Sequence, residues 1–263
     1  MSGQHPVRCA CDDPHKQRNL MSQAMQYLCP AELVAMIEHK NLSLDALRVF
    51  HALCYFTDQH PTFQITSMTS PSQRSAHILS RKLTACTFPP STNDLRPVRA
   101  TMQALQAAGL VEVFNFSDTN RDVRFRFSRR VIESITARRK DGQFAMMEPG
   151  MLSQLSSAAH VLFYTRVVMH QGANVPIFYI PGINPQTAPW SQMRRRWIGA
   201  ACKLSRIYGH GYLFCPEVDF ASTAVIRMRV KITHPETTWY PGRLYHRIAT
   251  NRRSPSLPAK RKA

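Results

Sequence analysis

The chain has 263 residues, of which 34 are Lys or Arg and 16 are Asp or Glu, so its formal net charge is +18. A charge of this size indicates a polyanionic partner, and phosphate backbones are the usual one because each neutralised phosphate releases condensed counterions. Hydrophobic residues make up 44% of the chain, which excludes a wholly disordered protein and allows a packed core.

A membrane surface would also attract this charge, but the sequence contains no apolar run of about 18 residues, so no membrane partner is expected. Residues 1–20 are polar, lack the apolar segment of a signal peptide, and are expected to form a disordered leader. The seven cysteines are odd in number and irregularly spaced, which favours a reduced, cytoplasmic compartment. Cys9, Cys11 and His15 could hold zinc, but no second ligand pair follows, so neither a metal nor another cofactor is expected.

Two helices are expected to open the first half, one over residues 22–40 and a second that Ser43 caps. Apolar residues of the second helix recur every three or four positions, and His51 on this face is expected to be a packed core residue. Residues 57–74 are rich in Thr, Ser, Pro and Gln and are expected to be a loop, with a short helix over 75–86.

A basic helix is expected over residues 95–108, with Gly109 as its stop. Its apolar positions, Leu95, Val98, Met102 and Leu105, share one face, and Arg96 and Arg99 lie on the open side.

A β-hairpin follows this helix, with strands over residues 110–116 and 123–127. Strict alternation in the second strand puts Val123, Phe125 and Phe127 on one side and the cations Arg124 and Arg126 on the other. Residues 136–150 are expected to be a linker or an exposed helix end, at the boundary between a first domain over 21–140 and a second domain over 150–234.

The second half is expected to contain a helix over 155–170 with Ser156 or Ser157 near its start, a strand over 176–180, and a long helix over 190–208. In the long helix the apolar face is made by Trp190, Met193, Trp197, Ala201, Leu204 and Tyr208. The opposite face or its flank carries the cations Arg194, Arg195, Arg196, Lys203 and Arg206.

A second hairpin is expected over residues 212–214 and 225–233, with Ile226, Met228, Val230 and Ile232 on one face. Its other face presents Arg227, Arg229 and Lys231. Residues 235–263 are rich in Pro, Arg and Lys and are expected to be a flexible basic tail, in which Arg252 and Arg253 are further candidate contacts.

Both halves therefore share one order: helix, loop, basic amphipathic helix, glycine stop, strand, polar loop, basic strand. A helix-turn-helix followed by a hairpin is the winged-helix plan, and the predicted fold class is α+β with two tandem winged-helix domains. The second helix of such a unit fits the major groove, and the hairpin lays its outward cations along the neighbouring backbone.

Charged helix faces are commonly just solvated, and alternating Arg on a strand can simply protect a sheet edge. A solvated face normally mixes signs, however, and the long helix has no acidic residue four positions from its cations. Two basic strands, each after a basic helix, make coincidence a weaker explanation.

This pattern resembles the plasmid replication initiators that carry two tandem winged-helix domains and bind iterons. The likeness covers residues 40–233 and is clearest in Ser157–Tyr164, in Ser191–Trp197 and in the strand pair after them. The resemblance implies that the helix over 190–208 reads the iteron's major groove, through Arg194, Arg195, Arg196, Lys203 and Arg206. It leaves open whether the first domain contacts DNA or forms a homodimer, because residues 57–94 are longer than the plan requires.

No catalytic centre is predicted, since the sequence lacks a phosphate-binding loop, a Gly-x-Ser-x-Gly elbow and a clear carboxylate cluster. Duplex DNA is therefore the favoured partner and plasmid replication initiation the favoured role. Two alternatives stay open: an RNA-binding or metal-independent RNA-processing protein that uses the same arginines, and a winged-helix transcriptional repressor.

Overall fold

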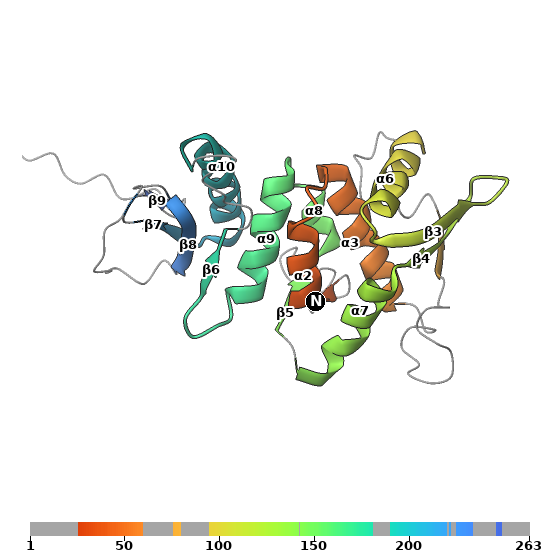
Figure 1. Cartoon of the computed structure of the whole chain (residues 1–263), viewed down its shortest axis with the longest axis horizontal. Coiled ribbons are helices and arrows are strands. Elements are labelled where there is room, and N and C mark those ends of the chain that lie inside the picture. Colours follow the sequence, from red (N-terminus) through yellow and green to blue (C-terminus); the bar gives the residue numbers. More distant parts are fainter. Residues whose placement is uncertain are drawn as a thin grey trace, which may run out of the picture.

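The computed structural model of the chain describes residues 26–59, 76–79, 95–141, 143–180, 190–219, 221, 225–233 and 246–248. Helices and short strands alternate along these residues, in the order β1 (Tyr27–Pro30), α2 (Ala31–Glu38), α3 (Leu44–Gln59), β2 (Ala76–Leu79), α6 (Arg96–Ala107), β3 (Val111–Phe116), β4 (Asp122–Phe127), α7 (Arg129–Asp141), β5 (Phe144–Met147), α8 (Pro149–Leu152), α9 (Ala158–His170), β6 (Ile177–Tyr179), α10 (Trp190–Tyr208), β7 (Gly211–Val218), β8 (Val225–Thr233) and β9 (His246–Ile248). The β3–β4 hairpin lies at one end of the long axis and the β7–β8 hairpin at the other (Figure 1).

The two halves repeat one topology. In the first half, the strand between the helices, β2, pairs antiparallel with β4, and β4 pairs with β3. In the second half β6 pairs with β8 in the same way, β8 pairs with β7, and β9 extends the sheet beyond β7. The predicted α+β class with two winged-helix units is confirmed.

Local signals set the ends of the main helices. Ser43 and Ser157 cap α3 and α9, each accepting a hydrogen bond from a backbone N–H three residues ahead at 3.1 and 3.2 Å. Gly109 and Gly209 follow α6 and α10 with φ +71° at both, a conformation that a side chain disfavours. The predicted glycine stops are therefore confirmed at both basic helices.

Buried faces also follow the predicted periodicity. Val98, Met102 and Leu105 of α6 are fully buried, as are Ala201 and Leu204 of α10. In the hairpins, Val123, Phe125 and Phe127 point inward, and so do Met228, Val230 and Ile232. Ile226 departs from its predicted face, because it lies near the hairpin tip beyond the core and is 42% exposed.

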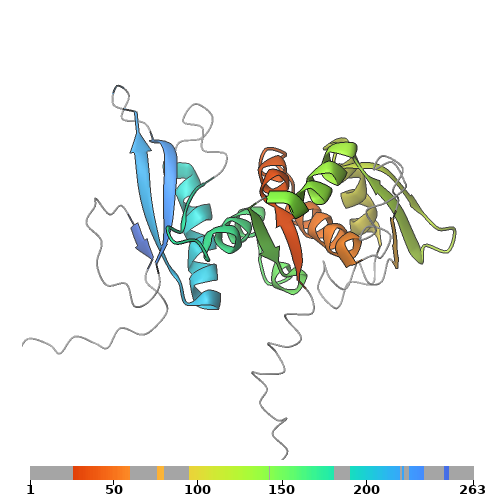
Figure 2. The same ribbon diagram turned by 90° about the horizontal axis from the view of Figure 1, so that it is seen from below.

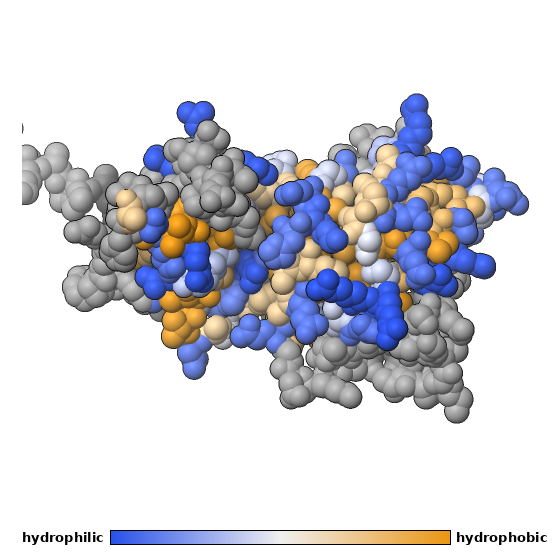
Figure 3. Space-filling model, viewed as in Figure 1, coloured by the Kyte–Doolittle hydropathy of each residue, from blue (hydrophilic) through white to orange (hydrophobic). Residues whose placement is uncertain are grey.

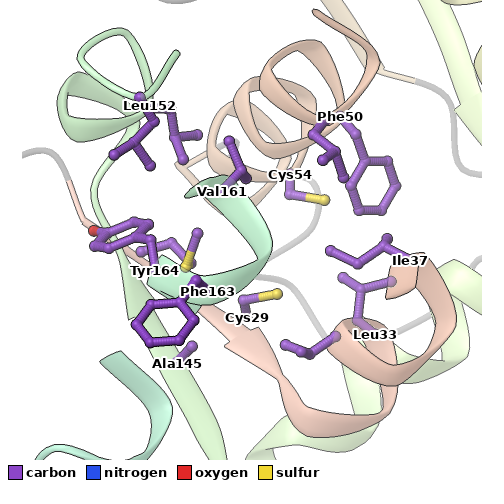
Figure 4. Packing of buried hydrophobic residues seen from close by; sticks show 14 of the residues in the cluster. Cys29, Leu33, Ile37, Phe50, Cys54, Ala145, Leu152, Val161, Phe163 and Tyr164 are labelled. Carbon is purple, nitrogen blue, oxygen red and sulfur yellow. The ribbon is translucent and has the colours of Figure 1, made fainter. Parts of the chain in front are cut away.

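One continuous hydrophobic core joins the halves. Helix α9 contacts α2, α3 and β5, and side chains such as Ile37, Phe50 and Val161 lie in a single cluster (Figure 4). Strand β1 pairs with β5 beside it, so the start of the described chain is tied to the segment between the halves (Figure 2). The division into domains over 21–140 and 150–234 stays a prediction.

Several predicted elements are wrong where a strand depends on a distant partner. Residues 27–30 form β1 rather than the start of a helix, and 76–79 form β2 rather than part of a helix. Residues 215–218 continue β7, and 246–248 form β9 inside the tail predicted to be flexible. Strands β1, β2 and β9 pair with residues far along the chain, and local propensity does not indicate such pairing, whereas residues 215–218 pair with the adjacent strand β8 in the hairpin.

Of the two alternatives for residues 136–150, the linker is wrong: α7 ends at Asp141, and β5 and the start of α8 follow. Pairing with β1 orders β5, and the buried Val131 and Ile132 anchor the first turn of α7 in the core. Leader residues 1–20 and the loop over 181–189 lie outside the described residues.

His51 is a packed core residue, as predicted, and a hydrogen bond joins its Nδ1 to the hydroxyl of Tyr27. Burial lowers the pKa of His51 from 6.5 to about 3, so the ring is neutral in the folded protein.

This burial predicts an acid-sensitive stability. The unfolded chain protonates His51 near its ordinary pKa of about 6.5, while the folded protein does not until far lower pH. The free energy of unfolding is therefore unaffected by His51 above that pH, and His51 contributes a loss of about 2 kcal/mol as the pH falls from 6.5 to 5. Urea unfolding at both pH values measures the loss, and H51Q should show a shallower decline. An equal decline in H51Q and in the wild-type chain would show that His51 is not the source of the acid sensitivity.

Candidate nucleic-acid interface

Helix α10 presents the densest group of predicted cations. Trp197 and Leu204 anchor its inner face in the core, and this orients the opposite face outward. The side chains of Arg194, Arg195, Arg196 and Arg206 are exposed, and Lys203 is half-buried. Within the described part of the chain, these five cations make no hydrogen bond or ion pair.

The absence of acidic residues from α10 leaves this charge uncompensated along the helix itself. Exposed cations with no intramolecular partner do not have to break an existing contact before they bind an anion. The arrangement can therefore bind a polyanion across about three helical turns at little reorganisation cost.

Helix α6 lies along the same upper edge of the molecule as α10, and hydrophilic side chains project from that edge at both ends (Figures 1 and 3). Its predicted residues Arg96 and Arg99 are exposed. Arg99, however, donates a hydrogen bond of 2.9 Å to Asn120 Oδ1, and its guanidinium lies 4.9 Å from the ring centroid of Phe116. Arg99 thus connects α6 to the turn and strand of the first hairpin.

The two cations of the first hairpin differ in their surroundings. Arg124 is exposed and has no partner among the described residues. Arg126 forms a two-pronged pair with Glu112 of the neighbouring strand, with nitrogen–oxygen distances of 3.1 and 3.0 Å. The carboxylate cancels much of the field of Arg126, so Arg124 is the more available cation.

In the second hairpin, Arg227, the cation nearest the tip, also has partners within the protein. The Arg227 guanidinium lies 3.6 Å from the ring centroid of Tyr179 and 3.6 Å from a carboxylate oxygen of Glu217. The Tyr179 hydroxyl donates to the other Glu217 oxygen at 3.1 Å, which closes a three-residue cluster across β6, β7 and β8. Arg229 is exposed, and Lys231 is half-buried.

The comparisons with known proteins bear on the fold. No family model matches the sequence, and no curated protein matches it. Among solved structures, the crystal structure of the Pi initiator protein in complex with iteron DNA matches with a TM-score of 0.51 and 13% identity. The fold is similar to that of the Pi initiator protein. The match covers 81% of this chain and 98% of the Pi initiator chain, so both winged-helix units take part in it.

In this interface, the sequence did not indicate which of the predicted arginines have partners within the protein. Glu112, Asn120 and Glu217 reach the predicted arginines only because of the hairpin register and the turn, and no short sequence spacing signals these contacts. Arg252 and Arg253 lie outside the described residues, as do Cys9, Cys11 and His15.

The part of the chain that the structure describes contains no group of three or more His, Cys, Asp or Glu side chains placed to hold a metal ion. None of its helices combines the length and apolar character needed to cross a membrane.

Proposed function

We propose that this chain binds double-stranded DNA sequence-specifically and initiates plasmid replication at repeated origin sites. The observation that carries the proposal is the set of exposed, unpaired arginines on α10, the second helix of a winged-helix unit. A helix of this kind fits the major groove, where Arg can form two hydrogen bonds to guanine.

Two other observations support duplex DNA as the partner. The repeated topology supplies two helices and two hairpins, which suits adjacent stretches of one double helix. The Pi initiator protein, whose fold is similar, was solved in complex with iteron DNA. Arg96, Arg99, Lys231 and Arg229 would then contact the phosphate backbone beside the two helices.

Selection of bound sequences from a random duplex pool tests the proposal. The purified chain is expected to enrich a defined duplex sequence, and to prefer it over an RNA hairpin and single-stranded DNA of equal length in competition at fixed salt. Preference for the RNA hairpin would overturn the proposal and favour RNA binding.

Replication and repression are separated by a second experiment. A plasmid that carries direct repeats of the enriched sequence and lacks another origin should replicate only when the chain is supplied. Repression of a promoter beside the repeats, without replication, would identify a transcriptional repressor of the same architecture.

The hairpin cations give a graded prediction. R124A should weaken binding to the enriched duplex about three- to tenfold, because Arg124 is exposed and unpaired within the described residues. R126A should weaken it less than about twofold, since Glu112 already neutralises Arg126. Equilibrium titration of both variants measures the difference, and equal losses would show that the Glu112 pair does not restrain Arg126.

The first half is also proposed to form a homodimer in the absence of DNA. Sedimentation equilibrium over a range of protein concentrations tests this, and a monomer at every concentration would contradict it.

A further inference from the structure

His160 lies in the first turn of α9, beside the cationic face of α10. Its backbone N–H donates to the Ser157 hydroxyl at 3.2 Å, which holds the residue at the helix start. The ring Nδ1 lies 3.3 Å from the Ser156 hydroxyl, and Nε2 has no partner among the described residues. One ring nitrogen is therefore held by the protein and the other is left available.

Gly199 gives His160 its place on the α10 surface. At 100° per residue Gly199 falls on the same side as Arg195, Lys203 and Arg206, where a long side chain would cover α9. Instead, a Cβ placed on Gly199 would lie 3.8 Å from His160 Nε2. The imidazole thus lies against the α10 surface next to Gly199 and near Lys203, although it comes from another helix.

The surroundings of His160 disfavour its charged form in the free protein. Partial burial and the positive charge of Lys203 both lower the pKa of His160 below 6.5. Lys203 is the charged group of α10 that acts on the ring, and the ring's hydrogen-bond partner among the described residues is the hydroxyl of Ser156, two residues before α9. His160 therefore holds a proton less readily in the free protein than an ordinary imidazole does.

We propose that His160 is a phosphate-binding residue of the α10 surface, and that it takes up a proton when a nucleic-acid phosphate docks against Nε2 and Lys203. This inference rests on the proposed function. A phosphate oxygen accepts a hydrogen bond from protonated Nε2, and its negative charge offsets the repulsion by Lys203.

The sign of the resulting pH dependence follows from linkage. A phosphate raises the pKa of His160 in the complex above its lowered value in the free protein. Between these two pKa values binding takes up a proton, so affinity rises as the pH falls. At pH values above the pKa of the complex, His160 is neutral in both states and its contribution to the pH dependence vanishes.

The test compares duplex affinity at pH 7.5 and pH 6.0, at constant ionic strength, for the full chain and H160Q. The wild-type chain should bind its enriched duplex about three- to tenfold more tightly at pH 6.0. H160Q should lose most of this pH-dependent gain. H39Q is the matched control, because His39 is exposed at the end of α2, and it should keep the wild-type gain.

A second measurement does not depend on a variant. NMR titration of the His160 ring in the wild-type chain should show a higher pKa with the duplex than without it. An unchanged His160 pKa, or equal pH dependence in H160Q and wild type, would overturn this inference. Failure of the wild-type chain to bind any duplex at either pH would instead overturn the proposed function.

Discussion

Replacing Arg195 and Arg196 together with Ala is expected to weaken binding to the enriched duplex by about 100-fold, with each side chain supplying about 1–3 kcal/mol of phosphate or base contact. Both side chains are exposed on α10 and lack a partner among the described residues, so their loss removes DNA contacts without breaking the fold. The dependence of log affinity on log salt should also flatten by about two units, if both arginines neutralise phosphates.

The matched control removes the same charge from another helix. R129A/R130A lies at the start of α7, on the far side of α9 from α10 (Figure 1). Arg129 forms an exposed pair with Glu133 at 2.7 Å. This control should lose little affinity. Equal losses in the two double variants would mean that net charge, rather than the α10 surface, governs binding.

The second large effect concerns the ion pair between the two halves. Arg166 of α9 donates to both oxygens of Glu38 at the end of α2, one of them at 2.6 Å from Nε. The Glu38 side chain is only 3% exposed. R166A therefore leaves a buried carboxylate without its partner and should lower the free energy of unfolding by about 3 kcal/mol.

Urea unfolding measures this loss, and two comparisons interpret it. E38L/R166M replaces both charges by apolar side chains and should recover much of the stability, because no unpaired charge is left buried. R129A breaks an exposed pair and should change stability little. A loss of less than about 1 kcal/mol in R166A would show that water reaches Glu38 in the folded protein.

A neighbouring contact has the same structural role. Arg48 of α3 donates to the carbonyl oxygens of Leu152, Ser153 and Leu155, at 3.1, 3.2 and 2.7 Å. Leu152 ends α8, and Ser153 and Leu155 follow it between the two halves. The cation of Arg48 is thus used inside the protein, where it supplies hydrogen bonds to carbonyls at and beyond a helix end.

Strong local periodicity explains which elements could be predicted. The apolar spacing of α10 and the alternation of β4 and β8 are properties of short segments. Their predicted buried positions, such as Leu204, Phe125 and Val230, are buried in the structure, and Ile226 near the tip of the second hairpin is the exception. Strands β1, β5 and β9 are only three or four residues long and exist through pairing with distant residues. Such pairing depends on how the whole chain folds, so these strands had no local signal.

The candidate site divides in the same way. Sequence by itself determined that cations gather on α10 and on the outer face of the hairpins, because helix and strand periods set the side that each residue faces. Tertiary structure alone decided which of those cations remain available. Cross-strand register places Glu112 beside Arg126 and Glu217 beside Arg227, and helix packing brings His160 to Gly199 and Lys203. These contacts join residues far apart in the chain, and only the folded backbone brings them within bonding distance.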